Sequence, residues 1–205
     1  MPVRDILLKD RLRGLKTYCV GGLPFKDVNQ AIQFVIERPW IVPFWPELPM
    51  RGRTESVLYR VERSARNEWK GYDQEEATGL FAFKDYVLKS KKKPPVIKCQ
   101  TLGPASYLDY RQAFKQNETK LLEQAAEITL KNIRYQKNFF KSIETPVLVV
   151  IDEPALDKWW DWNSTTKDIV SDLLQSLIRE AMKEDIYVGL HTCGCQSPRF
   201  LKFDL

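Results

Sequence analysis

Short runs of apolar and β-branched residues alternate along the chain with segments in which apolar residues recur every three or four positions. The runs predict five strands, at 17–20, 41–42, 96–102, 147–151 and 186–190. The segments with helical spacing predict amphipathic helices at 27–38, 54–65, 81–88, 115–140 and 166–181. This alternation is typical of βα units around a parallel sheet, because parallel strands need long crossover connections.

Local signals predict where several of these helices begin and end. Asp27 is placed to cap the first helix, with Gln30 reaching back in a capping box. Pro39 ends that helix near Arg38, since proline disfavours the helical conformation in the residue before it. Thr54 is the predicted cap of the second helix.

Five strand–helix repeats favour either a doubly wound sheet or the first part of a (βα)8 barrel. Both architectures bind ligands at the carboxyl ends of their strands, where the polar and glycine-containing motifs of this chain lie. The sequence contains neither GxGxxG nor GxxxxGK[ST], so it shows no dinucleotide or P-loop signature. We therefore predict a single α/β domain over 1–205, a (βα)8 TIM-barrel type that is incomplete, with about five βα units present.

An incomplete barrel has consequences for its edges. Unpaired strand edges and an open interior invite pairing with another chain. We therefore expect either that these residues are a piece of a longer polypeptide or that a partner or self-association covers the edges.

Composition supports one soluble globular domain. The 205 residues, 24.0 kDa, are 43% hydrophobic and 29% charged, with a mean hydropathy of −0.40. The apolar run 147–151 is too short to cross a bilayer, so no membrane association is expected. The N-terminus lacks the pattern of a secretory signal, and the four cysteines form no disulfide framework. These features predict a cytoplasmic protein with reduced thiols.

The net charge of +5 is a weak indication of nucleic-acid binding. Residues 1–100 carry 19 Lys and Arg against 12 Asp and Glu, whereas residues 101–205 carry 13 against 15. The dense basic run, 89–93, is followed by two prolines, as in a solvated loop. No basic face interleaved with aromatic residues accompanies it, so we expect no nucleic-acid partner.

The segment from His191 to Cys195, His-Thr-Cys-Gly-Cys, has the greatest concentration of metal-binding side chains. Alternate residues of an extended chain point to one side, so His191 and Cys193 would face a metal together, and their donors suit zinc. Cys195 joins them only if the chain stays extended through Gly194. The alternative is that His191 forms a hydrogen bond at a strand end and both cysteines are inert.

Two further groups of residues are candidates for substrate binding. Asp152 and Glu153 follow the buried strand 147–151, where a carboxylate could bind an ammonium group or act as a base. Adjacent residues point apart, so only one of the two should face the site, and the sequence does not say which. Glycines and a serine follow two other strands and permit either close backbone approach to a ligand or tight turns: Gly21, Gly22, Gly103 and Ser106.

In this order, the motifs resemble the catalytic domain of cobalamin-independent methionine synthase and, more broadly, the superfamily that includes uroporphyrinogen decarboxylase and corrinoid-dependent methyltransferases. The matching segments are 21–25 with Asp27, then 43–49, 98–104, 151–156 and 191–194. The specific part is Asp-Glu-Pro after a strand, followed some forty residues later by His-x-Cys-Gly. The resemblance runs over nearly the whole chain.

The resemblance implies a (βα)8 barrel and a zinc-dependent transfer of a methyl group from a folate or a methylated corrinoid protein to a homocysteine-type thiol. His191 and Cys193 would be zinc ligands, and Asp152 would hold the amino group of the substrate. The chain departs from the family at Gly22, where serine is usual, and at Cys195. The family takes its remaining zinc ligands from later strands, so the site is incomplete in these residues.

Two other functions remain open from the sequence. The first is a decarboxylase-like enzyme that binds a tetrapyrrole without metal, for which Arg51 and Arg53 are candidate residues, although solvated loop positions suit them better. The second is a truncated, non-catalytic barrel that serves as a binding or interaction module.

Overall fold

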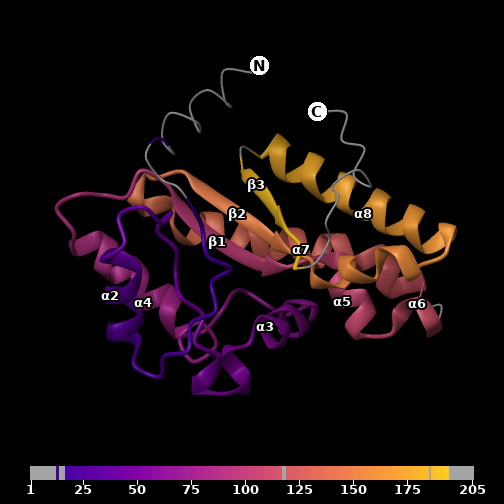
Figure 1. Ribbon diagram of the computed structural model, residues 1–205, viewed down its shortest axis with the longest axis horizontal. Coiled ribbons are helices and arrows are strands. Elements are labelled where there is room, and N and C mark those ends of the chain that lie inside the picture. Colours follow the sequence, from indigo (N-terminus) through magenta and orange to yellow (C-terminus); the bar gives the residue numbers. More distant parts are fainter. Residues whose placement is uncertain (1–12, 14–16, 117–118, 185, 194–205) are drawn as a thin grey trace.

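The computed structural model describes residues 13, 17–116, 119–184 and 186–193, and its centre is a parallel sheet (Figure 1). The three strands are β1 (Ile97–Leu102), β2 (Val147–Asp152) and β3 (Tyr187–His191), in the order β1-β2-β3. Their register pairs Leu102 with Asp152 and Asp152 with His191. The carboxyl ends of all three strands therefore lie at the same edge of the sheet.

Seven α-helices occur among the described residues: three precede β1, three lie between β1 and β2, and one lies between β2 and β3. Their bounds are α2 (Val28–Ile36), α3 (Val57–Ser64), α4 (Thr78–Lys89), α5 (Pro104–Tyr110), α6 (Ala113–Gln116), α7 (Thr119–Phe139) and α8 (Ser164–Lys183). Short 3-10 helices lie at η1 (Pro49–Arg51), η2 (Arg53–Glu55), η3 (Lys141–Ile143) and η4 (Pro154–Asp161). No described helix is sufficiently long and apolar to span a membrane.

The predicted (βα)8 barrel is wrong for this structure. The described residues form an open α/β arrangement with a three-stranded sheet, which is too small to close on itself. The predictions of strands at 17–20 and 41–42 are wrong, because neither segment forms a continuous ladder. The N-terminal segments make only isolated parallel bridges, Thr17 with Ile41, Gly22 with Glu47 and Phe44 with Lys98. Prolines at 43 and 46 lack the N–H group that a continuous ladder needs.

Helices α7 and α8 pack on one face of the sheet, and α2 and α4 pack together and join the same hydrophobic cluster. Alternate strand residues such as Cys99, Val149 and Leu190 join one hydrophobic cluster with side chains of these helices. The opposite face is mixed. Leu148 and Val150 form a small apolar cluster there with Val42 and Val96. Polar groups on that face come from strand residues of the same parity, namely Lys98, Gln100, Asp152 and His191.

Helix starts follow the predicted chemistry in one case and differ in another. The Asp27 carboxylate accepts a hydrogen bond from Gln30 N at 2.9 Å and caps α2. The predicted Thr54 cap is wrong, because Thr54 lies within η2 and Ser56 caps α3 through Tyr59 N. Helix α5 was not expected from the sequence pattern. It begins directly after β1 with Gly103 as N-cap and a proline in its first turn.

Candidate functional site

Asp152 and His191 meet at the carboxyl edge of the sheet. They end β2 and β3 as register partners, and Asp152 Oδ1 lies 3.2 Å from His191 Nδ1. Both atoms are buried and make no hydrogen bond within the described part of the chain. Burial raises the pKa of Asp152 to about 7, although the positive charge of Lys98 acts to lower it. Burial and Lys98 lower the pKa of His191. Burial therefore favours the neutral form of both groups relative to the same groups in water.

Glu153 points the other way, as alternation along the strand requires. Its carboxylate accepts hydrogen bonds from Ala105 N at 2.9 Å and Ser106 N at 2.7 Å, so it binds the first amides of α5. Burial raises the pKa of Glu153 to about 7, while these bonds and the Ser106 side chain act to lower it. Ser106 Oγ in turn accepts from Ala155 N at 3.0 Å. Glu153 and Ser106, both predicted to bind substrate, are engaged in holding α5 and η4 to the sheet.

Lys98 is buried and lies on the same face of the sheet as Asp152. Its ammonium group donates to the Val20 carbonyl and, at 3.0 Å, to Gln100 Oε1. Burial lowers the pKa of Lys98, and the carboxylates of Asp152 and Glu47 act in the opposite direction. Lys98 therefore links the N-terminal segment to β1 and lies within the electrostatic field of two carboxylates.

Glu47 is the second carboxylate near this edge. Its backbone bridges to the glycine segment, with Glu47 N donating to Gly21 O and Leu23 N donating to Glu47 O, both at 2.9 Å. Its side chain pairs with the buried guanidinium of Arg60, which also donates to the carbonyls of residues 55 and 76. Arg60 therefore holds Glu47 in place.

The glycine candidates occupy different environments. Gly21 has φ +133°, and a Cβ atom there would lie 2.5 Å from the Gln100 side chain. A Cβ atom at Gly103 would lie 2.2 Å from Glu153 Oε1. Gly22 is different, because it is exposed and a Cβ atom there would meet nothing within 4 Å. Packing thus explains Gly21 and Gly103, whereas Gly22 faces open space.

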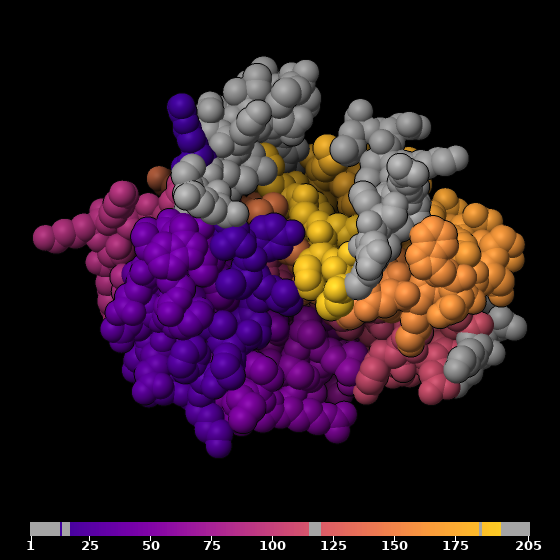
Figure 2. Space-filling view, viewed as in Figure 1, coloured from indigo at the N-terminus to yellow at the C-terminus, as the bar shows by residue number. Residues whose placement is uncertain are grey.

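The structure describes two of the three candidate zinc ligands. His191 ends β3, and Cys193 lies exposed two residues later. Burial and the nearby charges of Asp157 and Asp152 raise the pKa of the Cys193 thiol. Cys195 lies outside the described residues. Figure 2 shows β3 (yellow) at the surface between the N-terminal segment (indigo) and the helices of the C-terminal half (orange).

The donor set fits part of a zinc site. Imidazole nitrogen and thiolate sulfur are preferred zinc ligands, and a carboxylate beside one ring nitrogen is the usual device that orients a metal-bound histidine. With Nδ1 facing Asp152, His191 has Nε2 left for a metal. Within the described ranges no group of three His, Cys, Asp or Glu side chains is placed to hold a metal ion. A zinc ion on His191 and Cys193 would need a further protein ligand.

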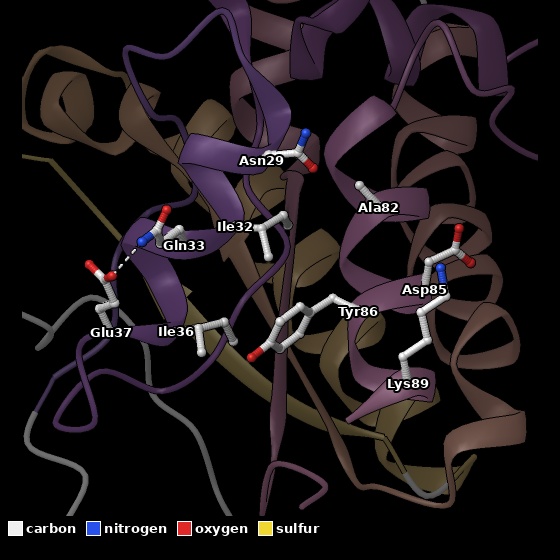
Figure 3. Close-up of a pocket in the computed structure, with 9 residues that line it drawn as sticks. All are labelled: Asn29, Ile32, Gln33, Ile36, Glu37, Ala82, Asp85, Tyr86 and Lys89. Carbon is white, nitrogen blue, oxygen red and sulfur yellow. Dashed lines mark hydrogen bonds between the residues drawn. The ribbon is translucent and has the colours of Figure 1, made fainter. Parts of the chain in front are cut away.

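A separate groove lies between α2 and α4, away from this edge (Figure 3). Its floor is apolar and its rim is polar. The floor is formed by Ile32, Ile36, Ala82 and Tyr86, and the rim by Asn29, Gln33, Glu37, Asp85 and Lys89. None of the predicted site residues lines it. We therefore place the candidate site at the carboxyl edge of the sheet.

The sequence patterns did not single out three residues of this site: Glu47, Lys98 and Gln100. Glu47 and Lys98 lie in segments that carried the family resemblance, but nothing in their spacing indicated that they approach Asp152. A lysine and a glutamine in alternate positions of an otherwise apolar strand were the available signal, because such residues rarely lie buried without a partner.

The fold and the site define an α/β protein with an open parallel sheet and a polar cluster at the carboxyl ends of its strands. Comparison of the chain with protein-family models, with curated proteins and with solved structures gave no match.

Proposed function

We propose that this chain is a zinc-dependent methyltransferase-like domain that transfers a methyl group to the thiol of a homocysteine-type amino acid. The observation that carries the proposal is the position of Asp152 beside His191, with Cys193 two residues further on. Because the fold lacks the barrel that the family resemblance implies, the proposal depends on the site rather than on the architecture. The proposal places the protein in the cytoplasm, where thiols stay reduced. The three described cysteines are free thiols.

Each side chain has a separate role in this proposal. His191 and Cys193 would hold zinc, which when bound makes a thiolate available at neutral pH. Asp152 Oδ1 lies beside His191 Nδ1, and Oδ2 would accept a hydrogen bond from the substrate ammonium group. Glu47 lies near the same edge and is neutralised by its ion pair with Arg60. A folate or a methylated corrinoid protein would supply the methyl group.

The metal-free decarboxylase-like alternative has less support. Arg51 approaches Glu55, with Nε 3.3 Å from Oε1, and its Nη1 donates to the Lys26 carbonyl at 3.1 Å. Arg53 lies exposed in η2. Arg51 is therefore engaged in loop structure, and no feature of the described residues favours a polycarboxylate ligand. The other alternative, a non-catalytic binding module, would be favoured if the chain binds no zinc.

The first test is the metal content of the Cys193→Ser variant. We expect near-stoichiometric zinc in the wild-type chain, purified without chelator or histidine tag, and almost none in the variant, because serine replaces one of two anchoring ligands. Elemental mass spectrometry measures both. Cys19→Ser is the control, since Cys19 is a partly buried thiol remote from the His-x-Cys pair in sequence, and it should keep its zinc. Equal zinc in wild type and Cys193→Ser, or none in wild type, would remove the proposal.

A second variant, Asp152→Asn, separates substrate binding from metal binding. We expect it to retain zinc and to bind L-homocysteine at least about tenfold more weakly, a loss of roughly 1.4 kcal/mol, because the amide lacks the charge that attracts an ammonium group. Titration calorimetry gives the affinity. Loss of zinc in Asp152→Asn would show instead that Asp152 is a metal ligand.

A further inference from the structure

The groove between α2 and α4 is lined by one stripe of residues from each helix. The two stripes have the same spacing, i, i+3, i+4 and i+7: Asn29, Ile32, Gln33 and Ile36 on α2, and Ala82, Asp85, Tyr86 and Lys89 on α4. The helices run in the same direction, with Asn29 and Ala82 at one end of the groove and Lys89 at the other (Figure 3). Stripes of this spacing are those with which helices pack against a further helix.

The apolar floor of the groove is open to a partner. The groove has a volume of about 660 Å³, and Tyr86 on its floor is 40% exposed. Helix α2 has nine residues and α4 has twelve, which correspond to lengths of about 13 Å and about 18 Å. Three turns of a partner helix would therefore cover the groove and bury this floor.

The groove becomes basic at one end. A second hollow of about 240 Å³ continues it, since Ile36 and Tyr86 line both. The charged residues that line the first hollow have both signs, and those that line the second are all cations: Glu37, Asp85 and Lys89 in the first, and Arg38, Lys92 and Lys93 in the second. An occupant that reaches the second hollow therefore meets net positive charge.

Two of these cations stabilise the ends of the helices, and two have no such role. Arg38 Nη1 donates to a carbonyl of α2 at 2.6 Å, and Lys93 Nζ donates to a carbonyl of α4 at 2.7 Å. Lys89 and Lys92 are exposed and form no hydrogen bond or ion pair with the described part of the chain. Their ammonium groups are therefore available to carboxylates of a partner.

We propose that this groove binds an amphipathic α-helix of another protein, which places an acidic first turn beside Lys89 and Lys92. The apolar side chains of the docked helix lie on the floor of the groove. The helix runs antiparallel to α2 and α4, because their C-terminal ends carry partial negative charge and favour the positive N-terminus of a neighbour. The groove lies away from Asp152 and His191, so this inference does not depend on the proposed function.

The experiment measures the binding of three blocked, alanine-based peptides of about 15 residues to the full chain by fluorescence anisotropy. The acidic peptide has leucines at i, i+3, i+4 and i+7 and three glutamates in its first turn. The basic peptide has lysines in place of these glutamates, and the scattered peptide has the composition of the acidic one with its leucines spread around the helix. Wild type should bind the acidic peptide at least about tenfold more tightly than either of the others. No binding of the acidic peptide, or equal binding of all three, would overturn the inference.

Tyr86→Glu tests the apolar floor. We expect it to weaken binding of the acidic peptide at least about tenfold, because the substitution places a charge where leucine side chains would lie. Leu88→Glu is the matched control, since Leu88 is 45% exposed on the same helix but does not line the groove, and it should bind as wild type does. Equal effects of the two variants would place the binding elsewhere.

The charge of the groove is tested by the double variant Lys89→Glu/Lys92→Glu. It should bind the basic peptide more tightly than the acidic one, which reverses the wild-type order. Lys91→Glu, at an exposed lysine that lines neither hollow, should keep the wild-type order. An unchanged order in the double variant would contradict the proposed acidic turn. A wild-type chain that dimerises without peptide in analytical ultracentrifugation, and becomes monomeric in Tyr86→Glu, would show that a second copy occupies the groove instead.

Discussion

Asp152 and Glu153 show how one step along a strand separates two identical functional groups. The first shares its face with Lys98 and His191, and the second binds the amides of α5. From the sequence, both were candidates for the site. The structure separates them, because successive side chains of a strand point to opposite faces.

Buried carboxylates outside the site provide a test of stability against pH. Glu55 is almost fully buried, Oε2 has no hydrogen-bond partner among the described residues, and burial raises its pKa. The folded state therefore binds this proton more strongly than the unfolded state does. The stabilisation is complete below the ordinary pKa of 4.5 and is lost as pH rises through the folded value.

We expect Glu55→Gln to remove this part of the pH dependence. Chemical denaturation between pH 4 and 8 should give a flatter stability profile for Glu55→Gln than for wild type. Glu75→Gln, at an exposed glutamate nearby, is the control and should follow the wild-type profile. Parallel profiles for wild type and Glu55→Gln would contradict the expected role of burial.

Helix α5 shows why a short element can escape sequence analysis and still be well fixed. Its seven residues are too few for a clear apolar period, and an isolated helix of that length is unstable in water. The Glu153 carboxylate, from the end of another strand, supplies acceptors for its first amides. Gly103 leaves the space that this carboxylate occupies.

Gly103→Ala should therefore destabilise the fold by at least about 2 kcal/mol, because the new methyl group displaces Glu153 from the α5 amides. Gly22→Ala is the matched control, since a Cβ atom there meets nothing within 4 Å, and we expect a change within about 0.5 kcal/mol. Urea denaturation of both variants measures the difference. Similar stabilities for the two alanine variants would show that the Glu153 contacts contribute little.

At the level of the whole molecule, a closed hydrogen-bond network joins the N-terminal segment, the sheet and α7. Trp45 Nε1 donates to Gln136 Oε1 at 2.8 Å, Gln136 Nε2 donates to Gln100 O at 2.9 Å, and Gln100 Nε2 donates to Trp45 O at 3.1 Å. All three side chains are buried. Since prolines prevent a continuous ladder between the 41–47 segment and β1, these bonds help to attach that segment to the sheet.

Gln136→Leu should cost about 2–4 kcal/mol of unfolding free energy, because it leaves the Trp45 N–H and the Gln100 carbonyl buried without partners. The double variant Trp45→Phe/Gln136→Leu should cost less than the sum of the two single variants, since it removes the indole N–H as well. Guanidinium denaturation of the set measures the coupling. Additive effects would show that the two side chains do not act as one network.

The three ladder strands and most helices followed from the sequence, because periodic burial and capping are local properties of the chain. The same patterns placed Asp152 and His191 at the ends of strands. The sheet stays open over the described residues, and only the tertiary structure showed this. Strand pairing depends on N–H groups, which the prolines at 43 and 46 lack. The approach of Glu47 and Lys98 to Asp152 also required the folded chain, because contacts between residues far apart in sequence follow from packing and register, which spacing along the chain does not encode.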